Sequence, residues 1–124
     1  MNYPVGDFLI QVKNAAMAKR REVIFADRKQ IREIAYVLKE KEYFDEVEKE
    51  DGKLKIRLTY IKKEPALISL KLISKPGLRI YMSVDELEKV KSPSFFIVST
   101  SKGVMTSKDA IKKRVGGEII AEIL

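Results

Sequence analysis

The sequence contains no Cys, no His and no Trp among its 124 residues. Disulfides, thiol nucleophiles, imidazole bases and the usual zinc ligands are therefore excluded. No apolar run approaches the roughly 20 residues that a membrane-spanning helix needs, and the N-terminus lacks the pattern of a secretory signal. We therefore expect a soluble, cytoplasmic protein with no membrane partner, no metal and no cofactor.

The charge is unbalanced and unevenly spread. Lys and Arg number 25 against 18 Asp and Glu, a net charge of +7. Seven basic and two acidic residues lie between Lys13 and Arg32, whereas six acidic residues and one lysine lie between Glu42 and Asp51. Mixed charge is usually just a solvated surface, but this segregation predicts that one end of the N-terminal half meets phosphate. We assign no function to the acidic run.

The first half of the chain predicts two helices and three strands. Helical spacing of apolar residues covers 8–16 and 31–38, with Asp27 as the expected N-cap of the second helix, and a short strand covers 23–25. Asp51-Gly52 predicts a hairpin between a strand that opens at 43–44 and an alternating strand over 54–60.

Lys62, Lys63, Glu64 and Pro65 break this pattern, so we place a domain boundary after Glu64. The second half, 65–124, predicts short strands and two brief helices. The pattern predicts strands at 68–72 and 78–82 around a Pro76-Gly77 turn, followed by a Ser83/Glu86 capping box and a helix at 84–90. It then predicts strands at 95–98 and 104–106, a helix capped by Ser107 and ended by Gly116-Gly117, and a strand at 119–123. The predicted fold class is α+β, with an N-terminal α-β-α-β-β domain (1–64) packed against a mostly β C-terminal domain with short helices (65–124).

The segment Ser99 to Gly103, Ser-Thr-Ser-Lys-Gly, carries the most specific chemistry. Three short hydroxyls in a row donate and accept hydrogen bonds and can reach unpaired bases and 2′-hydroxyls of RNA. Lys102 offers charge to phosphate, and Gly103 either allows RNA to approach or supplies a positive φ for the turn. From chemistry alone, a Ser/Thr-rich segment is more often an ordinary loop.

Longer motifs resemble a known family. STSKGVMT (99–106), Val115-Gly116-Gly117-Glu118 and SKPGLRIY (74–81), with Pro4-Val5-Gly6-Asp7 and Lys13-Asn14-Ala15 near the start, closely resemble the universal small-subunit ribosomal protein number eight family. The resemblance spans nearly the whole chain. It implies a non-enzymatic protein that binds small-subunit ribosomal RNA at a stem with an internal loop in the central domain, supports subunit assembly and sits as a monomer beside neighbouring small-subunit ribosomal proteins. It further implies, in bacteria, binding to a similar stem in the messenger of the protein's own operon, with repression of translation.

The resemblance also assigns roles to single residues. Ser99, Thr100 and Ser101 would read the internal loop, with Gly103 allowing its approach and Lys102 meeting phosphate. Gly117 and Glu118 would lie beside that loop. Lys13 and Asn14 would contact the RNA backbone, together with Lys29, while Tyr81 is either a core ring or a hydroxyl that reaches RNA.

This chain departs from the family pattern at two places. Ile10-Gln11-Val12-Lys13-Asn14 stands where Thr-Arg-Ile-Arg-Asn is common, which removes one basic residue. Ala26-Asp27-Arg28-Lys29 replaces Pro-Ser-Ser-Lys, which removes hydroxyls but keeps Lys29.

Two rival hypotheses remain. An enzyme would need Ser99 or Ser101 paired with Lys102, but neighbouring residues of a loop tend to point apart and no third group is placed to orient them. A free-standing regulator that binds RNA stems would differ in sedimentation, because a ribosomal protein should travel with small subunits.

Overall fold

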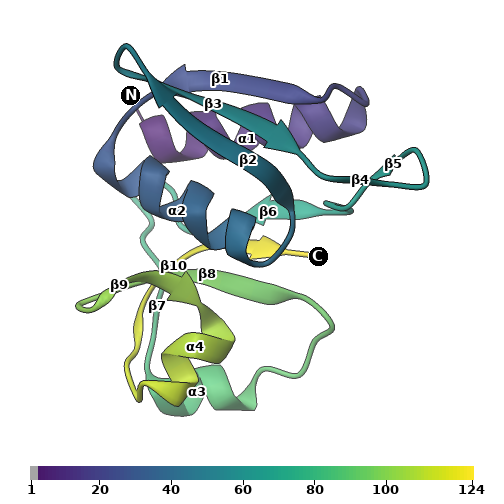
Figure 1. The fold of residues 1–124 in the computed structure, drawn as a ribbon. Helices are drawn as coiled ribbons and strands as arrows, with labels where there is room; N and C mark the ends of the chain where they lie inside the picture. The colour runs from purple at the N-terminus through teal and green to yellow at the C-terminus, as the bar shows by residue number, and fades with distance from the viewer. Residues whose placement is uncertain (1–2) are drawn as a thin grey trace. The chain divides into compact units, whose positions relative to one another are not determined.

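The computed structural model describes residues 3–124, which form two compact units, one ending at Ile68 and the other covering Ser69–Leu124 (Figure 1). Each unit has its own sheet and its own helices. The α+β class and the order of the main elements agree with the sequence-based prediction. Among residues 3–124, no helix combines the length and the apolar character needed to cross a membrane.

The first unit is a three-stranded antiparallel sheet with two helices. Its elements are α1 (Pro4–Met17), β1 (Glu22–Ala26), α2 (Lys29–Glu40), β2 (Phe44–Glu50) and β3 (Lys53–Leu58), with strand order β1-β3-β2. β3 alternates strictly, so Leu54, Ile56 and Leu58 are buried while the residues between them are exposed. The apolar stripes of α1 and α2 are buried in the same unit, which leaves the opposite face of the sheet to charged side chains.

The Asp51-Gly52 hairpin forms as predicted. Both residues have positive φ, 50° and 75°, the backbone that a two-residue turn between twisted strands requires.

The segment after β3 differs from the prediction. Instead of breaking, the chain forms a second small hairpin from β4 (Tyr60–Ile61) and β5 (Glu64–Pro65), and the Ala66 N–H donates to the Thr59 carbonyl at 2.9 Å. Pro65 is tolerated because it lies on a two-stranded edge. These pairings keep the segment with the first unit, so the chain divides after Ile68 rather than after Glu64.

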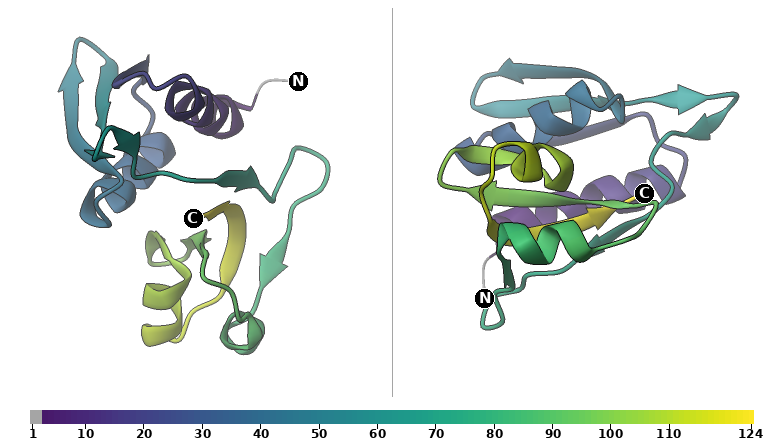
Figure 2. Two further views of the ribbon diagram at one scale, coloured as in Figure 1. Left: turned by 90° about the vertical axis from the view of Figure 1, so that its right-hand side faces the viewer. Right: turned by 90° about the horizontal axis from the view of Figure 1, so that it is seen from below.

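The second unit is a five-stranded antiparallel sheet with two short helices (Figure 2). Its elements are β6 (Leu70–Leu72), β7 (Tyr81–Met82), α3 (Val84–Lys89), β8 (Phe95–Thr100), β9 (Gly103–Thr106), α4 (Ser107–Lys112) and β10 (Gly117–Ile123). β10 pairs with β6, β7 and β8, and β9 forms the edge beside β8. The first two strands are shorter than predicted, and Ile68 lies outside them with 78% of its surface exposed.

The helices of the second unit cover one face of this sheet. Leu87 of α3 and Ala110 of α4 share a buried cluster with Val98, Met105 and Ile119 from three neighbouring strands. Residues one position along each strand therefore point to the other face.

Several helix ends differ from the sequence expectations. The capping box of Ser83 and Glu86 is present. α4, however, is capped by the hydroxyl of Thr106, because the Ser107 hydroxyl instead accepts a hydrogen bond from the Phe96 N–H at 3.1 Å. Arg114 has φ 57°, and the Arg114 and Val115 N–H groups donate to backbone carbonyls of the last helical turn. These hydrogen bonds end the helix, so Gly116 and Gly117 are not its stop signal.

Asp27 does not cap α2. The N-cap is Arg28, whose side chain makes no capping bond. The Asp27 carboxylate instead lies 2.8 Å from Arg32 Nε and 3.3 Å from Lys49 Nζ, which ties the start of α2 to β2. The hydrogen bond from Arg32 is the largest influence on the pKa of Asp27 and lowers it. Desolvation opposes this shift, and Lys49 adds to it, so that the pKa is lowered overall.

Candidate nucleic-acid interface

The turn between β8 and β9 contains the hydroxyl segment. Ser99 and Thr100 end β8, Ser101 and Lys102 are exposed at the tip, and Gly103 begins β9. The Thr100 hydroxyl donates to the Gly103 carbonyl at 2.7 Å and accepts from the Lys102 N–H at 3.0 Å. The Thr100 hydroxyl therefore uses its proton and one lone pair in hydrogen bonds that close the turn.

Gly103 has φ 110°, a conformation that side chains with a Cβ rarely adopt. The turn itself thus requires glycine at this position, whatever binds to it.

One row of residues crosses the sheet at the base of this turn. Strand register places Tyr81 opposite Glu118, Glu118 opposite Ser99, and Ser99 opposite Val104. Directly opposed residues share a face, and this face is the one opposite α3 and α4. The row therefore brings Tyr81, Glu118 and Ser99 together although they are far apart in the sequence.

The Tyr81 side chain is not a core ring, because 65% of its surface is exposed. Beside it, the partly buried Glu118 carboxylate accepts a hydrogen bond from Arg79 Nη1 at 3.0 Å. Arg79 was missed by the sequence reasoning, although it lies two residues before Tyr81 within the SKPGLRIY motif. It partly neutralises the one acidic group in the row, which would otherwise repel phosphate.

Gly117, the first residue of β10, and Gly116, directly before it, both lie against backbone atoms of other segments. A Cβ at Gly117 would stand 2.2 Å from the Ser99 carbonyl oxygen and 3.2 Å from Thr100 Cα, and one at Gly116 would stand 2.4 Å from the Met82 carbonyl oxygen. Gly117 therefore sets the distance between β10 and the end of β8. Its observed role is to let the hydroxyl turn sit where it does.

The remaining predicted residues belong to the first unit. Lys13 and Asn14 lie on the exposed side of α1, beside the buried Val12, and Lys29 is the exposed first residue of α2. The structure thus gathers the C-terminal candidates into one turn and one row, while these three lie on two separate helices of the other unit.

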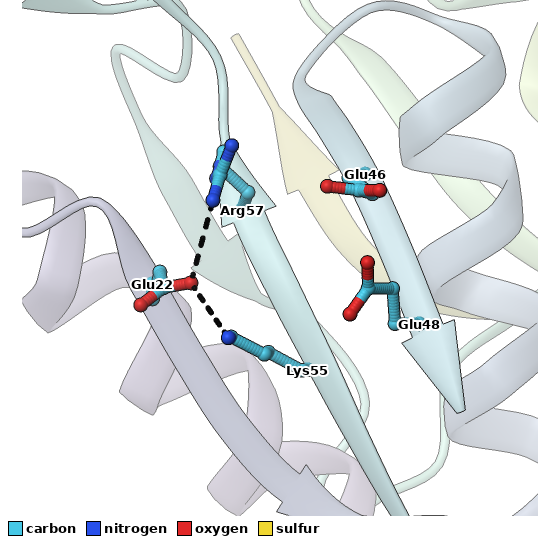
Figure 3. A pocket seen from close by; sticks show the side chains of 5 residues that line it. All are labelled: Glu22, Glu46, Glu48, Lys55 and Arg57. Atoms are coloured by element: carbon cyan, nitrogen blue, oxygen red, sulfur yellow. Dashed lines mark ion pairs between the residues drawn. The ribbon is translucent and has the colours of Figure 1, made fainter. Parts of the chain in front are cut away.

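A shallow pocket on the outer face of the first sheet contains both charges. Figure 3 shows Glu22 within reach of Lys55 and Arg57, at 3.4 and 3.8 Å, with Glu46 and Glu48 on the neighbouring strand. Its acidic and basic side chains offset one another, so this face is not suited to bind a polyanion.

The chemistry of the second unit is that of a binding surface. Ser101 and Lys102 are adjacent residues at an exposed tip, with no arrangement that would activate a nucleophile. No group of acidic residues within 3–124 is placed to hold a metal ion. Short hydroxyls, an exposed tyrosine and a lysine around one turn are typical of proteins that bind nucleic acid.

Comparison with known proteins identifies the family. The family model for ribosomal protein S8 matches residues 3–124. Small ribosomal subunit protein uS8 of Nitratidesulfovibrio vulgaris (strain DP4) is 38% identical over 121 residues, covering 97% of this chain and 96% of the relative. The uS8 protein of Exiguobacterium sibiricum is 40% identical over 129 residues, covering 99% and 98%. The chain belongs to the ribosomal protein S8 family, as its motifs predict.

This family consists of structural, non-enzymatic constituents of the small ribosomal subunit, and binding of ribosomal RNA is general within it. The predictions of a non-catalytic, ribosomal protein that acts in the cytoplasm are thereby confirmed.

Proposed function

We propose that this chain binds small-subunit ribosomal RNA directly, at a stem with an irregular internal loop in the central domain, and so supports subunit assembly. The observation that carries the proposal is the placement of Ser99 and Ser101 around one turn, with Ser99 in the same cross-strand row as the exposed Tyr81, on the face opposite α3 and α4. An irregular loop presents the unpaired base edges and 2′-hydroxyls that such side chains bind.

The two serines differ from Thr100 in what they can offer. Within the described part of the chain, neither the Ser99 nor the Ser101 hydroxyl makes a side-chain hydrogen bond, whereas Thr100 makes two within the turn. Ser99 and Ser101 therefore read the RNA, and Thr100 chiefly holds the turn. Gly103 has no side chain that would obstruct the approach of RNA. Gly117 and Glu118 support the turn from the neighbouring strand β10.

The backbone contacts come from Lys13, Asn14, Lys29 and Lys102. All four are exposed, and three carry a positive charge. Contacts of this kind position a protein on RNA, while contacts to base edges specify the site. Neighbouring small-subunit proteins would complete the environment in the assembled particle.

The same surface would bind a second RNA that carries a similar stem. A reading surface recognises the loop geometry and not the molecule that contains it. We therefore include repression of the protein's own operon messenger in the proposal, and competition between the messenger stem and the ribosomal stem for the full chain tests it. Simultaneous binding of both stems would contradict it.

The main test compares two RNAs and two variants of the full chain. The double substitution Ser99→Ala and Ser101→Ala should reduce the preference for the internal-loop stem over a regular duplex, by about 1–3 kcal/mol per lost contact. The control is Ser69→Ala, an exposed serine of the same unit outside the row. Retention of the full preference by the double variant would remove the turn from the reading surface.

A further inference from the structure

Five exposed basic residues that the proposed function does not use lie at one end of the first unit. Lys19, Arg20 and Arg21 form the connection from α1 to β1, and Lys62 and Lys63 form the tip of the β4-β5 hairpin. The hairpin extends beyond the end of the three-stranded sheet, on the side where α1 ends (Figures 1 and 2). We name these five residues the hairpin patch.

The two segments of the hairpin patch are held together by three contacts. The Tyr60 hydroxyl donates to the Arg20 carbonyl at 2.7 Å, and the Arg21 guanidinium stands 4.8 Å from the centre of the Tyr60 ring. Lys19 Nζ lies 3.2 Å from a Glu64 carboxylate oxygen. The patch is thus a built surface, in which segments some 40 residues apart are fixed to each other.

The local charge stays strongly positive. Glu64, paired with Lys19, is the acidic residue of the hairpin itself. Glu22, which directly follows Arg21, is directed to Lys55 and Arg57 on the sheet (Figure 3). Unlike the sheet face with its offsetting charges, the hairpin patch therefore presents a field that favours a polyanion.

The hairpin tip has an unusual composition for its conformation. Lys62 and Lys63 both have positive φ, 51° and 70°, in a two-residue turn for which Asn-Gly is the preferred sequence. Lysine at both positions is less favourable for folding than Asn-Gly would be. The two lysines place two positive charges side by side at the tip of the hairpin.

We propose that the hairpin patch is a phosphate-binding surface that holds RNA backbone without reading its sequence, in addition to the reading surface at the β8-β9 turn. The inference rests on the proposed function only in that the partner is RNA. Its cations are long, flexible and close to one another, while no row of hydroxyls accompanies them. Such a surface adds affinity that depends on salt and not on base identity.

The test uses the full chain with charge removed from the tip. The variant K62N/K63G should lose affinity for the internal-loop stem and for a regular duplex by the same factor, and the slope of log affinity against log salt should become shallower by roughly one to two units. Because Asn-Gly suits the turn, its melting temperature should be equal to or above that of the wild type. Opposite effects on stability and binding separate a functional role from damage to the fold.

A matched pair controls for net charge. K62Q/K63Q should behave like K62N/K63G toward RNA, whereas K112Q/K113Q removes the same charge from exposed lysines at the end of α4 and should leave the slope unchanged. Equal slopes for all variants and the wild type would overturn the proposal. A wild type that showed no preference for the internal-loop stem over the regular duplex would instead contradict the reading surface. The salt slopes of the variants would still test the hairpin patch.

Discussion

The β8-β9 turn and the hairpin patch are built by different means, although both surround a two-residue turn. The first is held by a side-chain hydroxyl and by close backbone packing, with Gly103 at φ 110° and Gly117 against Ser99. The second is held by one ion pair, one tyrosine hydrogen bond and a cation over an aromatic ring, with lysines at φ 51° and 70°. A surface that discriminates between bases needs fixed geometry, whereas one that holds phosphate needs only charge.

This contrast extends to how each unit should respond to change. Around the β8-β9 turn, substitutions that add side-chain atoms should change stability more than salt or pH does, because the constraint is steric. In the first unit, substitutions that change charge should have the larger effect on stability, and salt should screen that effect. The following predictions test these differences, beginning with the largest expected effect.

Substituting Gly117→Ala should be the most damaging single change. The new Cβ would lie 2.2 Å from a backbone oxygen of β8, so one strand must move, which we expect to cost about 3 kcal/mol in the free energy of unfolding. Urea titration of the full chain at low and high salt measures this cost, which should not depend on salt. The control is Gly77→Ala, where φ is 84° and no atom lies within 4 Å of the new Cβ, with an expected cost of about 1 kcal/mol. Equal effects at the two glycines would show that the close packing of β10 is not a constraint.

Substituting Gly103→Ala should cost about 1–2 kcal/mol, because alanine is strained at φ 110°. RNA affinity of the folded protein should fall as well, since the turn presents Ser101. Isothermal titration on protein shown to be folded by circular dichroism separates the two effects. A loss of affinity with unchanged unfolding would mean that glycine provides room for RNA and is not required by the turn.

Substituting Thr100→Ala should destabilise the turn by about 1 kcal/mol, because the Gly103 carbonyl and the Lys102 N–H both lose a partner. Thr100→Ser retains the hydroxyl and should restore most of the loss. Thermal unfolding and RNA binding of both variants measure this. Rescue of binding without any change in unfolding would assign Thr100 to RNA contact instead.

Substituting Asp27→Asn should give the smallest effect and the one that depends on pH. The pKa of Asp27 is lowered in the folded protein by Arg32 and Lys49, so the ionised carboxylate stabilises the fold above its unfolded pKa. That contribution is lost as the pH falls through the lowered value, so the difference in melting temperature between wild type and variant should close below about pH 4. It should also shrink in high salt, because the Arg32 and Lys49 side chains are 35% and 55% exposed. A difference that persists unchanged in acid would mean that the ion pairs contribute nothing.

The sequence predicted well wherever the signal was local. Asp51-Gly52 supplies the backbone preference of its own turn, and Ser83 with Glu86 forms a cap within one helical turn. Apolar spacing in α1 and α2 marked the buried faces, because a helix with one apolar stripe has only one way to bury it. The hydroxyl motif was likewise found from neighbouring residues, and its family assignment followed from the spacing of several such motifs.

The errors arose where a residue had two possible partners. Asp27 and Ser107 stand at positions that suit an N-cap, yet their side chains bind Arg32 and the Phe96 N–H. Lys62-Lys63 contains none of the usual turn residues, and the turn forms because β4 and β5 pair around it. Local propensity indicates which residues suit a role such as N-cap. A stronger contact with another element decides whether a residue takes that role.

What the sequence alone determined was the class of fold, the two amphipathic helices, the main hairpin and the family to which the chain belongs. Only the tertiary structure decided that Gly117 spaces two strands, that Arg79 pairs with Glu118 and that Tyr60 fixes the hairpin patch. The reason is physical: short-range preferences act through the backbone of a few consecutive residues, whereas these contacts join residues up to 40 positions apart and exist only once both elements have folded.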